Sequence, residues 1–486
     1  MMNVNWNHAT AERGRDGQAS MAVVATDPLF HQLGEFHQEA LLLSHIGQAI
    51  RDLGVPERCE ILNVWYIFKK RFQVVYRVRG GQDTGEDAIL LVEFLPRGTS
   101  PRRFQEAIAG ARNRKAVVHL PAWDAIARIF PEDPGLPWLS AMIDRQTMAS
   151  RMSRHLTHSL DGILLSWDLM SYLPGQRCAV RYELGSPPWA LFAKMQRGDS
   201  TGRAHRRMVR LWESPHRRFR MPRPLGYHEG LGLRWESFAS GRRIEDLLPR
   251  VDLDAFLARI VRDLVSLHGM RLQDLAPNGL EQVIHRLEQK VLPRIRETLS
   301  PVASSLDAFH TTLMQKAGSL PERRAMTIHG DFHTANVLVD DEGATFTDLD
   351  SLACGDPAYD LALLGSRLLL IALHRGERVR EITGAVADLP MAYEAASGHR
   401  IPARTFAWYM AALLVGRQIK TCVRHRAPAC GQLATALLAL AHETLRRERF
   451  DASTVSGCGD LCQAATPAMT PTGAAAVGRV MDMGEA

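Results

Sequence analysis

Hydrophobic and polar positions alternate in two separate parts of the chain, which predicts two groups of β-strands. In residues 60–96, the runs ILNVWYIF and FQVVYRVR are followed by a glycine-containing polar turn and then AILLVEFL. In residues 167–196, WDLMSYLPGQRCAVRYEL predicts a strand, a turn and a strand, and WALFAKMQ predicts a third strand. Short runs rich in β-branched and aromatic residues, bounded by turn residues, are typical of hairpins and meanders. We therefore predict two small antiparallel units.

The two β-rich segments also align with one another, which indicates an internal repeat. Four pairs coincide in one register: Tyr66 with Tyr172, Arg71 with Arg177, Val74 with Val180 and Tyr76 with Tyr182. In that register Glu93 falls opposite Lys194, so the first copy lacks the positive charge that could hold a phosphate. A chance alignment is the alternative.

Helical spacing dominates the rest of the chain. We predict helices near residues 103–115 and 199–213 and a nearly all-helical region from 360 to about 447. From Leu253 the apolar positions 253, 256, 257, 260, 261 and 264 follow a helical period, with Asp252 as the N-cap. Residues 1–28 and 451–486 are polar or rich in small residues, and we expect them to be disordered.

Composition narrows the class of protein. The 486-residue chain has ordinary hydrophobic and charged fractions, 46% and 23%, which allow several structural units with a large core. No apolar run is long enough to cross a membrane, and the first 20 residues contain no apolar signal-peptide core, so we do not expect secretion. Met1 and Met21 both stay open as the true start. The seven cysteines are scattered, and Cys458 and Cys462 lack partners for a zinc site. We expect a cytoplasmic protein with reduced thiols.

The net charge of +6 is modest, and the arginines lie in dispersed pairs without a basic and aromatic stripe. This favours a solvated surface over nucleic-acid binding, so we predict neither a nucleic-acid partner nor a membrane partner. The oligomeric state stays open.

The chemistry is concentrated in residues 327–365, TIHGDFHTANVLVDDEGATFTDLDSLACGDPAYDLALLG. Asp331 stands on a loop five residues before Asn336, which leads into a short strand. A tight turn and a returning strand bring Asp348 back beside Asn336. Two oxygen donors at the end of a hairpin suit Mg²⁺, and Asp331 is left able to accept a proton from a hydroxyl.

The motifs HGDFHTANVL and TDLDSLACGDPAYDLA resemble the catalytic core of the aminoglycoside phosphotransferase and choline kinase-like family, which shares the protein-kinase fold. The resemblance implies ATP and Mg²⁺ as cofactors, with Asp331 as the catalytic base and Asn336 and Asp348 as metal ligands. It implies supporting roles for the loop residue His329 and for Asp356 and Asp360, which fix the loop and cap the next helix.

The resemblance also implies an upper half of the site. Lys194 matches the lysine that contacts the α- and β-phosphates, and Glu213, at the end of the following predicted helix, is the acidic candidate to pair with it. The turn containing Gly175 would cover the phosphates, although it has one glycine instead of three, and Arg177 could assist. Glu236 and Phe238 lie in the crossover that would receive adenine.

These observations predict an α+β, two-lobed, protein-kinase-like fold with an extra N-terminal region. The expected units are residues 29–155 (accessory α+β region), 160–238 (β-rich N-lobe) and 239–450 (helical C-lobe). The expected reaction is transfer of the γ-phosphate of ATP to a hydroxyl of a small molecule. Many arginines and few carboxylates in residues 365–447 favour a neutral or anionic acceptor over a polycationic aminoglycoside.

Two alternatives stay open. His329, Asp331 and His333 lie close together and could form a metal hydrolase site, although that reading leaves Asn336 and Lys194 without a role. A pseudokinase that binds nucleotide without catalysis is the second alternative, which the single-glycine loop favours.

Overall fold

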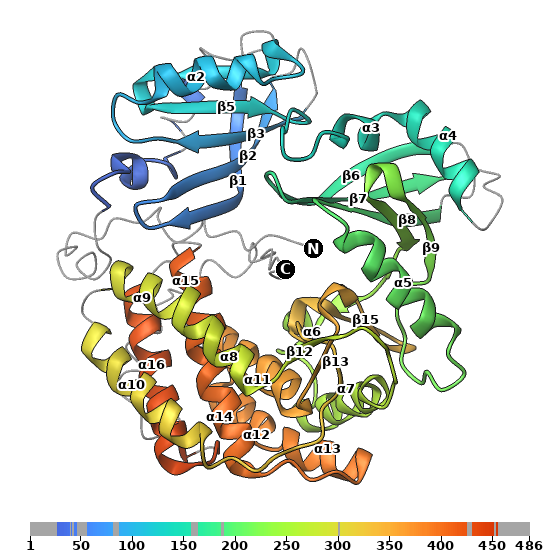
Figure 1. Ribbon diagram of the computed structural model, residues 1–486, viewed down its shortest axis with the longest axis vertical. Coiled ribbons are helices and arrows are strands. Elements are labelled where there is room, and N and C mark those ends of the chain that lie inside the picture. Colours follow the sequence, from blue (N-terminus) through green and yellow to red (C-terminus); the bar gives the residue numbers. More distant parts are fainter. Residues whose placement is uncertain are drawn as a thin grey trace.

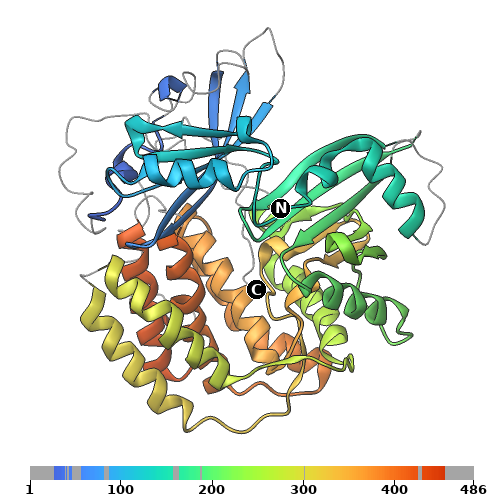
Figure 2. The same cartoon turned by 45° about the horizontal axis from the view of Figure 1, so that its top comes forward.

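The chain forms two β-sheet units above a larger helical lobe (Figures 1 and 2). This computed structural model describes residues 27–38, 40, 43–45, 56–80, 87–156, 164–185, 189–299, 302–424, 430–451 and 453–454. The two terminal segments predicted to be disordered, and the Cys458–Cys462 pair, lie almost entirely outside these residues. The predicted α+β class, with a β-rich part and a larger helical lobe, is confirmed.

The first unit is a five-stranded antiparallel sheet of order β1-β2-β3-β5-β4. Its strands are β1 (Pro56–Ile67), β2 (Arg71–Gly80), β3 (Asp87–Phe94), β4 (Val117–Leu120) and β5 (Ala125–Ile129), with α2 (Ser100–Ala109) between β3 and β4. One face packs around aromatic side chains that include Phe72, Phe94 and Trp123. The helix predicted near 103–115 corresponds to α2 and begins three residues earlier, at the Ser100-Pro101 pair.

The second unit repeats this architecture with the order β6-β7-β8-β10-β9. Its strands are β6 (Leu164–Leu173), β7 (Arg177–Leu184), β8 (Trp189–Gln196), β9 (Pro224–His228) and β10 (Leu233–Ser237), with α5 (Ser200–Glu213) between β8 and β9. In both units, therefore, a helix follows the third strand, and the fourth and fifth strands form a hairpin.

The predicted repeat is confirmed in atomic detail. Tyr66 Oη donates to Asp27 Oδ2 at 2.8 Å, and Tyr172 Oη donates to Asp133 Oδ2 at the same distance. Gln73 pairs with Glu93 across the first sheet, and Ala179 pairs with Lys194 across the second. Glu93 and Lys194 therefore occupy the same place, as the alignment predicted.

The repeat also sets the boundary between the units earlier than predicted. Leu136, Met142 and Met152 pack in the core of the second sheet, together with α3 (Leu139–Ile143) and α4 (Arg145–His155). Asp133 corresponds to Asp27, which opens the first unit. The second unit thus begins near residue 131, not between 155 and 160, because its sheet needs these helices to cover one face.

The helical lobe holds the largest core. Its helices are α6 (Ile244–Leu247), α7 (Leu253–His268), α8 (Leu280–Arg286), α9 (Leu292–Thr298), α10 (Ala303–Ala317), α11 (Pro357–Arg375), α12 (Val379–Ala387), α13 (Leu389–Ser397), α14 (Ala403–Leu413), α15 (Lys420–Arg424) and α16 (Cys430–Arg447). Two π-helical turns, Leu287–Val291 and Leu414–Ile419, interrupt this pattern. As predicted, Asp252 caps α7, accepting from the backbone N–H of Asp254 and Ala255.

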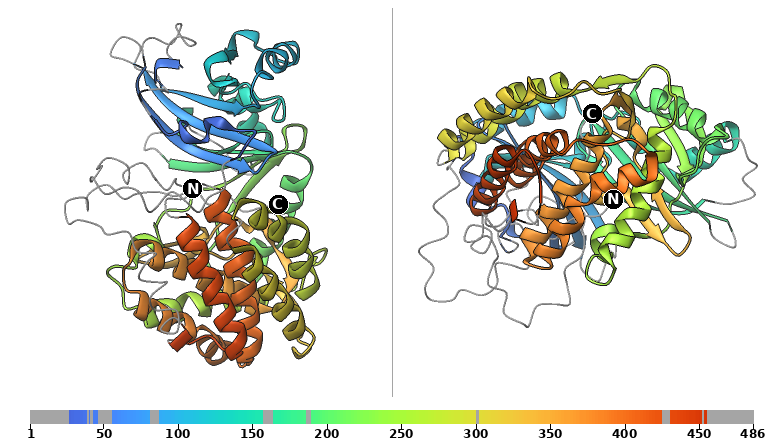
Figure 3. Two further views of the ribbon diagram at one scale, coloured as in Figure 1. Left: turned by 90° about the vertical axis from the view of Figure 1, so that its left-hand side faces the viewer. Right: turned by 90° about the horizontal axis from the view of Figure 1, so that it is seen from below.

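Two short sheets connect the helices to the catalytic segment: β11 (Arg242–Arg243) with β14 (Val337–Asp340) and β15 (Gly343–Phe346), and β12 (Ala276–Asn278) with β16 (Ala353–Gly355) and β13 (Met326–Ile328). Figure 3 shows both large sheets lying on the same side of the helices. Among the described residues, no helix combines the length and apolar character that crossing a membrane requires.

Candidate active site

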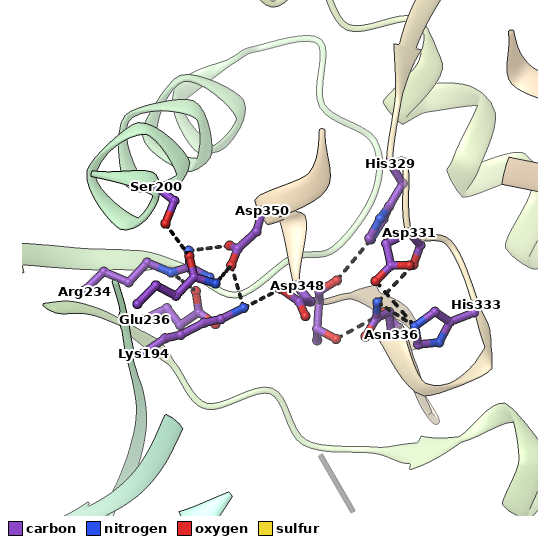
Figure 4. Close-up of polar contacts among 12 residues, drawn as sticks. Lys194, Ser200, Arg234, Glu236, His329, Asp331, His333, Asn336, Asp348 and Asp350 are labelled. Carbon is purple, nitrogen blue, oxygen red and sulfur yellow. Dashed lines mark hydrogen bonds and ion pairs between the residues drawn. The ribbon is translucent and has the colours of Figure 1, made fainter. Parts of the chain in front are cut away.

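The predicted hairpin forms and brings Asn336 and Asp348 together. β14 and β15 pair from Val337–Phe346 to Asp340–Gly343. Just beyond the paired strands, the N–H of Thr347 donates to the carbonyl oxygen of Asn336 at 2.9 Å. Asp348 is the next residue, and its φ of +55° turns its side chain out of the strand direction toward the second sheet (Figure 4).

Asp360 fixes the loop that carries Asp331 by binding its backbone. The fully buried Asp360 carboxylate accepts from the backbone N–H of His329 at 2.6 Å and of Gly330 at 3.0 Å. Gly330 has a φ of +77°, and a Cβ there would lie 2.1 Å from the carbonyl oxygen of Ser351. Only glycine therefore lets this loop lie against the chain that follows Asp348.

His329 and Asp356 brace the same region. His329 Nε2 lies 3.0 Å from the carbonyl oxygen of Thr347, so the ring bridges the loop and the hairpin. Asp356 Oδ1 accepts from the N–H of Ala358 at 2.9 Å and caps α11, while Arg323 binds its other oxygen at 2.8 Å. The metal hydrolase alternative is weakened, because within the described part of the chain no three His, Cys, Asp or Glu side chains are grouped so that they could hold a metal ion together.

Lys194 joins the second sheet to this segment. Its Nζ lies 2.6 Å from Asp348 Oδ1 and 2.5 Å from Asp350 Oδ2, and its side chain is 1% exposed. Burial by itself raises the pKa of Asp348, but Lys194 and then Arg177 outweigh burial and bring that pKa well below its usual range. Asp348 is therefore a carboxylate across the whole physiological pH range.

Two buried groups that the sequence analysis did not select complete this cluster. Arg234, opposite Lys194 on β10, forms an ion pair with Asp350 Oδ1, and its Nε lies 3.4 Å from Glu236. Burial raises the pKa of Asp350, but Arg234 and then Lys194 more than reverse this, so its pKa is lowered. Asp350 could have been found from its place two residues after Asp348. Nothing in the sequence around Arg234 indicated a role in the site, because only the pairing of β10 with β8 places it beside Lys194.

Asp331 and His333 form a second, smaller group (Figure 4). His333 Nε2 lies 3.6 Å from Asp331 Oδ2, and Asn336 Nδ2 donates to the backbone oxygen of Asp331 at 2.9 Å. Arg417, from the π-helical turn before α15, forms an ion pair with Asp331 Oδ1. No sequence pattern connects Arg417 with Asp331, since 86 residues separate them.

The donors at Asn336 and Asp348 fit a hard divalent cation. The amide nitrogen of Asn336 is engaged with Asp331 and lies 3.3 Å from His333, so its oxygen is the atom left to face a cation. Asp348 supplies a carboxylate whose pKa is depressed. An amide oxygen beside an ionised carboxylate is the donor set that Mg²⁺ binds together with phosphate oxygens.

The turn at Gly175 is shaped by an acid, not by several glycines. Asp133 Oδ2 accepts from the N–H of Gly175 at 2.7 Å, in addition to the hydroxyl of Tyr172. Gly135 passes so close that a Cβ on it would lie 2.4 Å from Gly175 Cα. The Gly175 N–H is therefore not available in this structure to bind a phosphate, which differs from its predicted role.

The remaining predicted residues lie in different surroundings. Glu213 is exposed at the end of α5, and within the described chain the ion pairs of Lys194 are with Asp348 and Asp350, not with Glu213. The predicted Glu213–Lys194 pair is therefore wrong in this structure, because the side chain of Glu213 is exposed to solvent whereas that of Lys194 is buried. Phe238 is half-buried under Arg181, and its N–H already donates to Ala190. Glu236 is buried beside Arg234, and burial raises its pKa.

Residues 197–385 match the family model described as the phosphotransferase enzyme family APH. Three solved structures resemble the fold loosely. Aminoglycoside phosphotransferase APH(4)-Ia is 16% identical (62% of this chain, 94% of that chain, TM-score 0.39). APH(3'')-Id from Streptomyces rimosus is 19% identical (50% and 90%, 0.35), and choline kinase LicA from Streptococcus pneumoniae is 13% identical (62% and 98%, 0.42). No curated protein matches the sequence. The resemblance predicted from the catalytic motifs is confirmed by the family match.

Proposed function

We propose that this protein is a small-molecule kinase that transfers the γ-phosphate of ATP to a hydroxyl group. The contact between Lys194 and Asp348, 2.6 Å across 154 residues of sequence, carries the proposal. It places a lysine of the β-rich unit directly on Asp348, the acid that the motif resemblance implies as a metal ligand. A phosphoryl-transfer site needs these two groups together, because the phosphates lie between them.

Each residue has a role that follows from its chemistry. Lys194 would donate to the phosphates that are not transferred, after exchanging its contact with Asp348 for contacts with phosphate oxygens. Asn336 and Asp348 would hold Mg²⁺, which offsets the negative charge of the phosphates when bound. Asp331 would accept the proton of the acceptor hydroxyl, and Arg417 would keep that carboxylate ionised and oriented. Asp350 and Arg234 would position Lys194.

A nucleotide-binding pseudokinase is the second candidate, and one observation favours it. The N–H of Gly175 is bound to Asp133, so the turn over the phosphates offers fewer backbone donors than a glycine-rich loop does. In this alternative Lys194, Asn336 and Asp348 would bind nucleotide without turnover.

Purified protein distinguishes the two candidates. We expect Mg-ATP to raise the melting temperature of the wild type and Asp348→Ala to abolish that shift. Asp331→Ala should retain nucleotide binding but lower turnover by about a thousandfold in a coupled assay with a panel of hydroxyl acceptors. Equal turnover in wild type and Asp331→Ala would remove the catalytic role of Asp331. No thermal shift with Mg-ATP would exclude both candidates.

A further inference from the structure

A pocket of about 470 Å³ lies where the first sheet, the second sheet and the helical lobe meet. The end of β1 (Trp65 to Phe68), the turn at residues 173–177, residues 196–200 and the helices α8, α9 and α15 form its walls. On β8 and β10, Leu191 lies opposite Ser237, which enters the crossover, whereas Met195 lies opposite Leu233. Gln196 is thus at the opposite end of the sheet from the crossover, and the pocket lies at that end.

The lining of this pocket is strongly basic. Among the described residues, eighteen line it; seven of these are lysine or arginine, and none of the eighteen is aspartate or glutamate. Arg286, Lys290 and Arg294 recur every four residues along α8 and α9, and Lys420 and Arg424 have the same spacing on α15. Arg286, Lys290 and Arg294 repel one another at this spacing, and an anion bound beside them would relieve that repulsion.

Arg177 is an independent indication of an anionic ligand. It is 6% exposed, lines the pocket and has no hydrogen-bond partner for Nε or Nη2. A buried guanidinium is normally hydrogen-bonded to an acceptor, because burying its charge without one is expensive. Within the described part of the chain no carboxylate forms an ion pair with Arg177, Lys290 or Arg294; Asp348 interacts with the charge of Arg177 only from beyond ion-pair distance.

The first sheet takes part in this pocket through Trp65. The centre of its ring lies 4.5 Å from Arg71 Cζ and 5.3 Å from Arg424 Cζ. β1 therefore contacts α15, and the two elements lie close together in the ribbon (Figure 1). The two π-helical turns lie beside the same wall: one contains Lys290 and the other ends directly before Lys420. Such turns often reposition side chains at functional sites.

Gln196 connects the pocket with the catalytic cluster. It lines the pocket, and its Nε2 donates to Asp350 Oδ2 at 2.9 Å, the same oxygen that Lys194 binds. A molecule in the pocket would thus lie next to the groups that hold the phosphates.

We propose that this pocket binds the phosphate acceptor and that the acceptor is a small polyanion with at least two phosphate or carboxylate groups beside its hydroxyl. This rests on the function proposed above. In the reaction the bond between the γ-phosphorus and the ADP oxygen breaks, a bond to the acceptor oxygen forms, and the hydroxyl proton passes to Asp331. The first sheet then serves to close the acceptor end of the site.

The binding test uses inorganic pyrophosphate as the probe, with the full chain in EDTA and titration calorimetry as the readout. We expect wild-type protein to bind it, and the double variant Lys290→Ala with Arg294→Ala to bind it at least tenfold more weakly. The control is Arg259→Ala with Arg262→Ala on the exposed face of α7, which removes the same charge and should change the Kd less than twofold. Melting curves of the pocket variant should be unchanged or shifted upward, since like charges are removed.

Pyrophosphate could also bind at Lys194, so Lys194→Ala is titrated in parallel and should keep its affinity within threefold. The proposal is overturned if the pocket variant binds as the wild type does, if Lys194→Ala alone loses binding, or if the wild type does not bind. A Mg-ATP melting shift separates the two proposals. A shift retained in the pocket variant supports a distinct acceptor site. If the wild type shows no shift but pyrophosphate binding depends on Lys290 and Arg294, the kinase function and the acceptor role fail and the anion site remains.

Discussion

Glu93 of the first sheet and Lys194 of the second occupy the same position in two sheets of the same strand order, yet their charges are opposite and their partners come from different places. Glu93 is bound by Arg128 of its own sheet at 3.3 Å and by Arg103 of the helix that follows its strand at 3.6 Å. Lys194 is bound by Asp348 and Asp350, from the helical lobe.

This difference shows how one architecture serves two purposes. In the first sheet, arginines of the same unit neutralise the charge of Glu93, so this charge needs no partner from the segment that carries Asp348 and Asp350. The second sheet leaves its lysine to be neutralised by the catalytic segment, or by phosphates that replace the carboxylates. The second sheet is therefore the one that belongs to the candidate active site, because the charge of Lys194 is neutralised by acids from the helical lobe.

The largest expected effect is on turnover. Lys194→Ala should lower kcat/KM for ATP by about a thousandfold, since it removes the cation closest to the proposed phosphate position. Glu93→Ala, at the matched position, should leave kcat/KM within twofold. Steady-state kinetics with any acceptor that supports turnover would measure both. Comparable losses in the two variants would show that the first sheet takes part in nucleotide binding.

A smaller effect is expected on stability. Asp350→Asn should lower the free energy of unfolding by about 3 kcal/mol, because Lys194 and Arg234 are buried and lose a charged partner. Glu93→Gln should cost less, about 2 kcal/mol, because buried Arg128 loses a charged partner whereas the pair with half-exposed Arg103 is screened. Urea denaturation at pH 7 measures both values, and equal losses would contradict the comparison.

The first of these two losses should also depend on pH. The pKa of Asp350 is lowered in the folded state, so its contribution to stability is present above the unfolded pKa of about 3.9 and is lost as the pH falls below it. The difference between wild type and Asp350→Asn should therefore be constant from pH 5 to 7 and shrink on further acidification. A difference that grows below pH 4 would rule out this origin.

The smallest contrast concerns the two equivalent acids Asp27 and Asp133. Asp27 Oδ2 accepts from the hydroxyl of Tyr66 and from the N–H of Lys69 at 2.7 Å, and Asp133 repeats both bonds with Tyr172 and Gly175. Replacing either by alanine should cost about 2 kcal/mol of stability. Only Asp133→Ala should change the KM for ATP, by severalfold, because only its turn is proposed to lie over the phosphates. The same KM in both variants would show that this turn does not contact nucleotide.

The local sequence alone was sufficient to predict the strands, the hairpin of the candidate site and the internal repeat. The alternation of residues 60–96 and 167–196 predicted the strands, because side-chain period decides which face is buried. The sequence between Asn336 and Asp348 predicted the hairpin, since the tight turn at residues 340–343 requires the second strand to run back beside the first. The alignment of Tyr66 with Tyr172 also matches Glu93 with Lys194 once the second copy is given a connection five residues shorter before its third strand, and the register of the two sheets agrees with this match.

Tertiary structure alone decided which charges meet. Arg234 reaches Asp350 because β10 pairs with β8, Arg417 reaches Asp331 because a π-helical turn directs it there, and Asp133 belongs to the second unit because α3 and α4 pack under that sheet. Periodicity reports how a residue faces its own element, but it contains no information about which element packs against it. The basic pocket is the clearest case, because its cations come from three parts of the chain that only folding brings together.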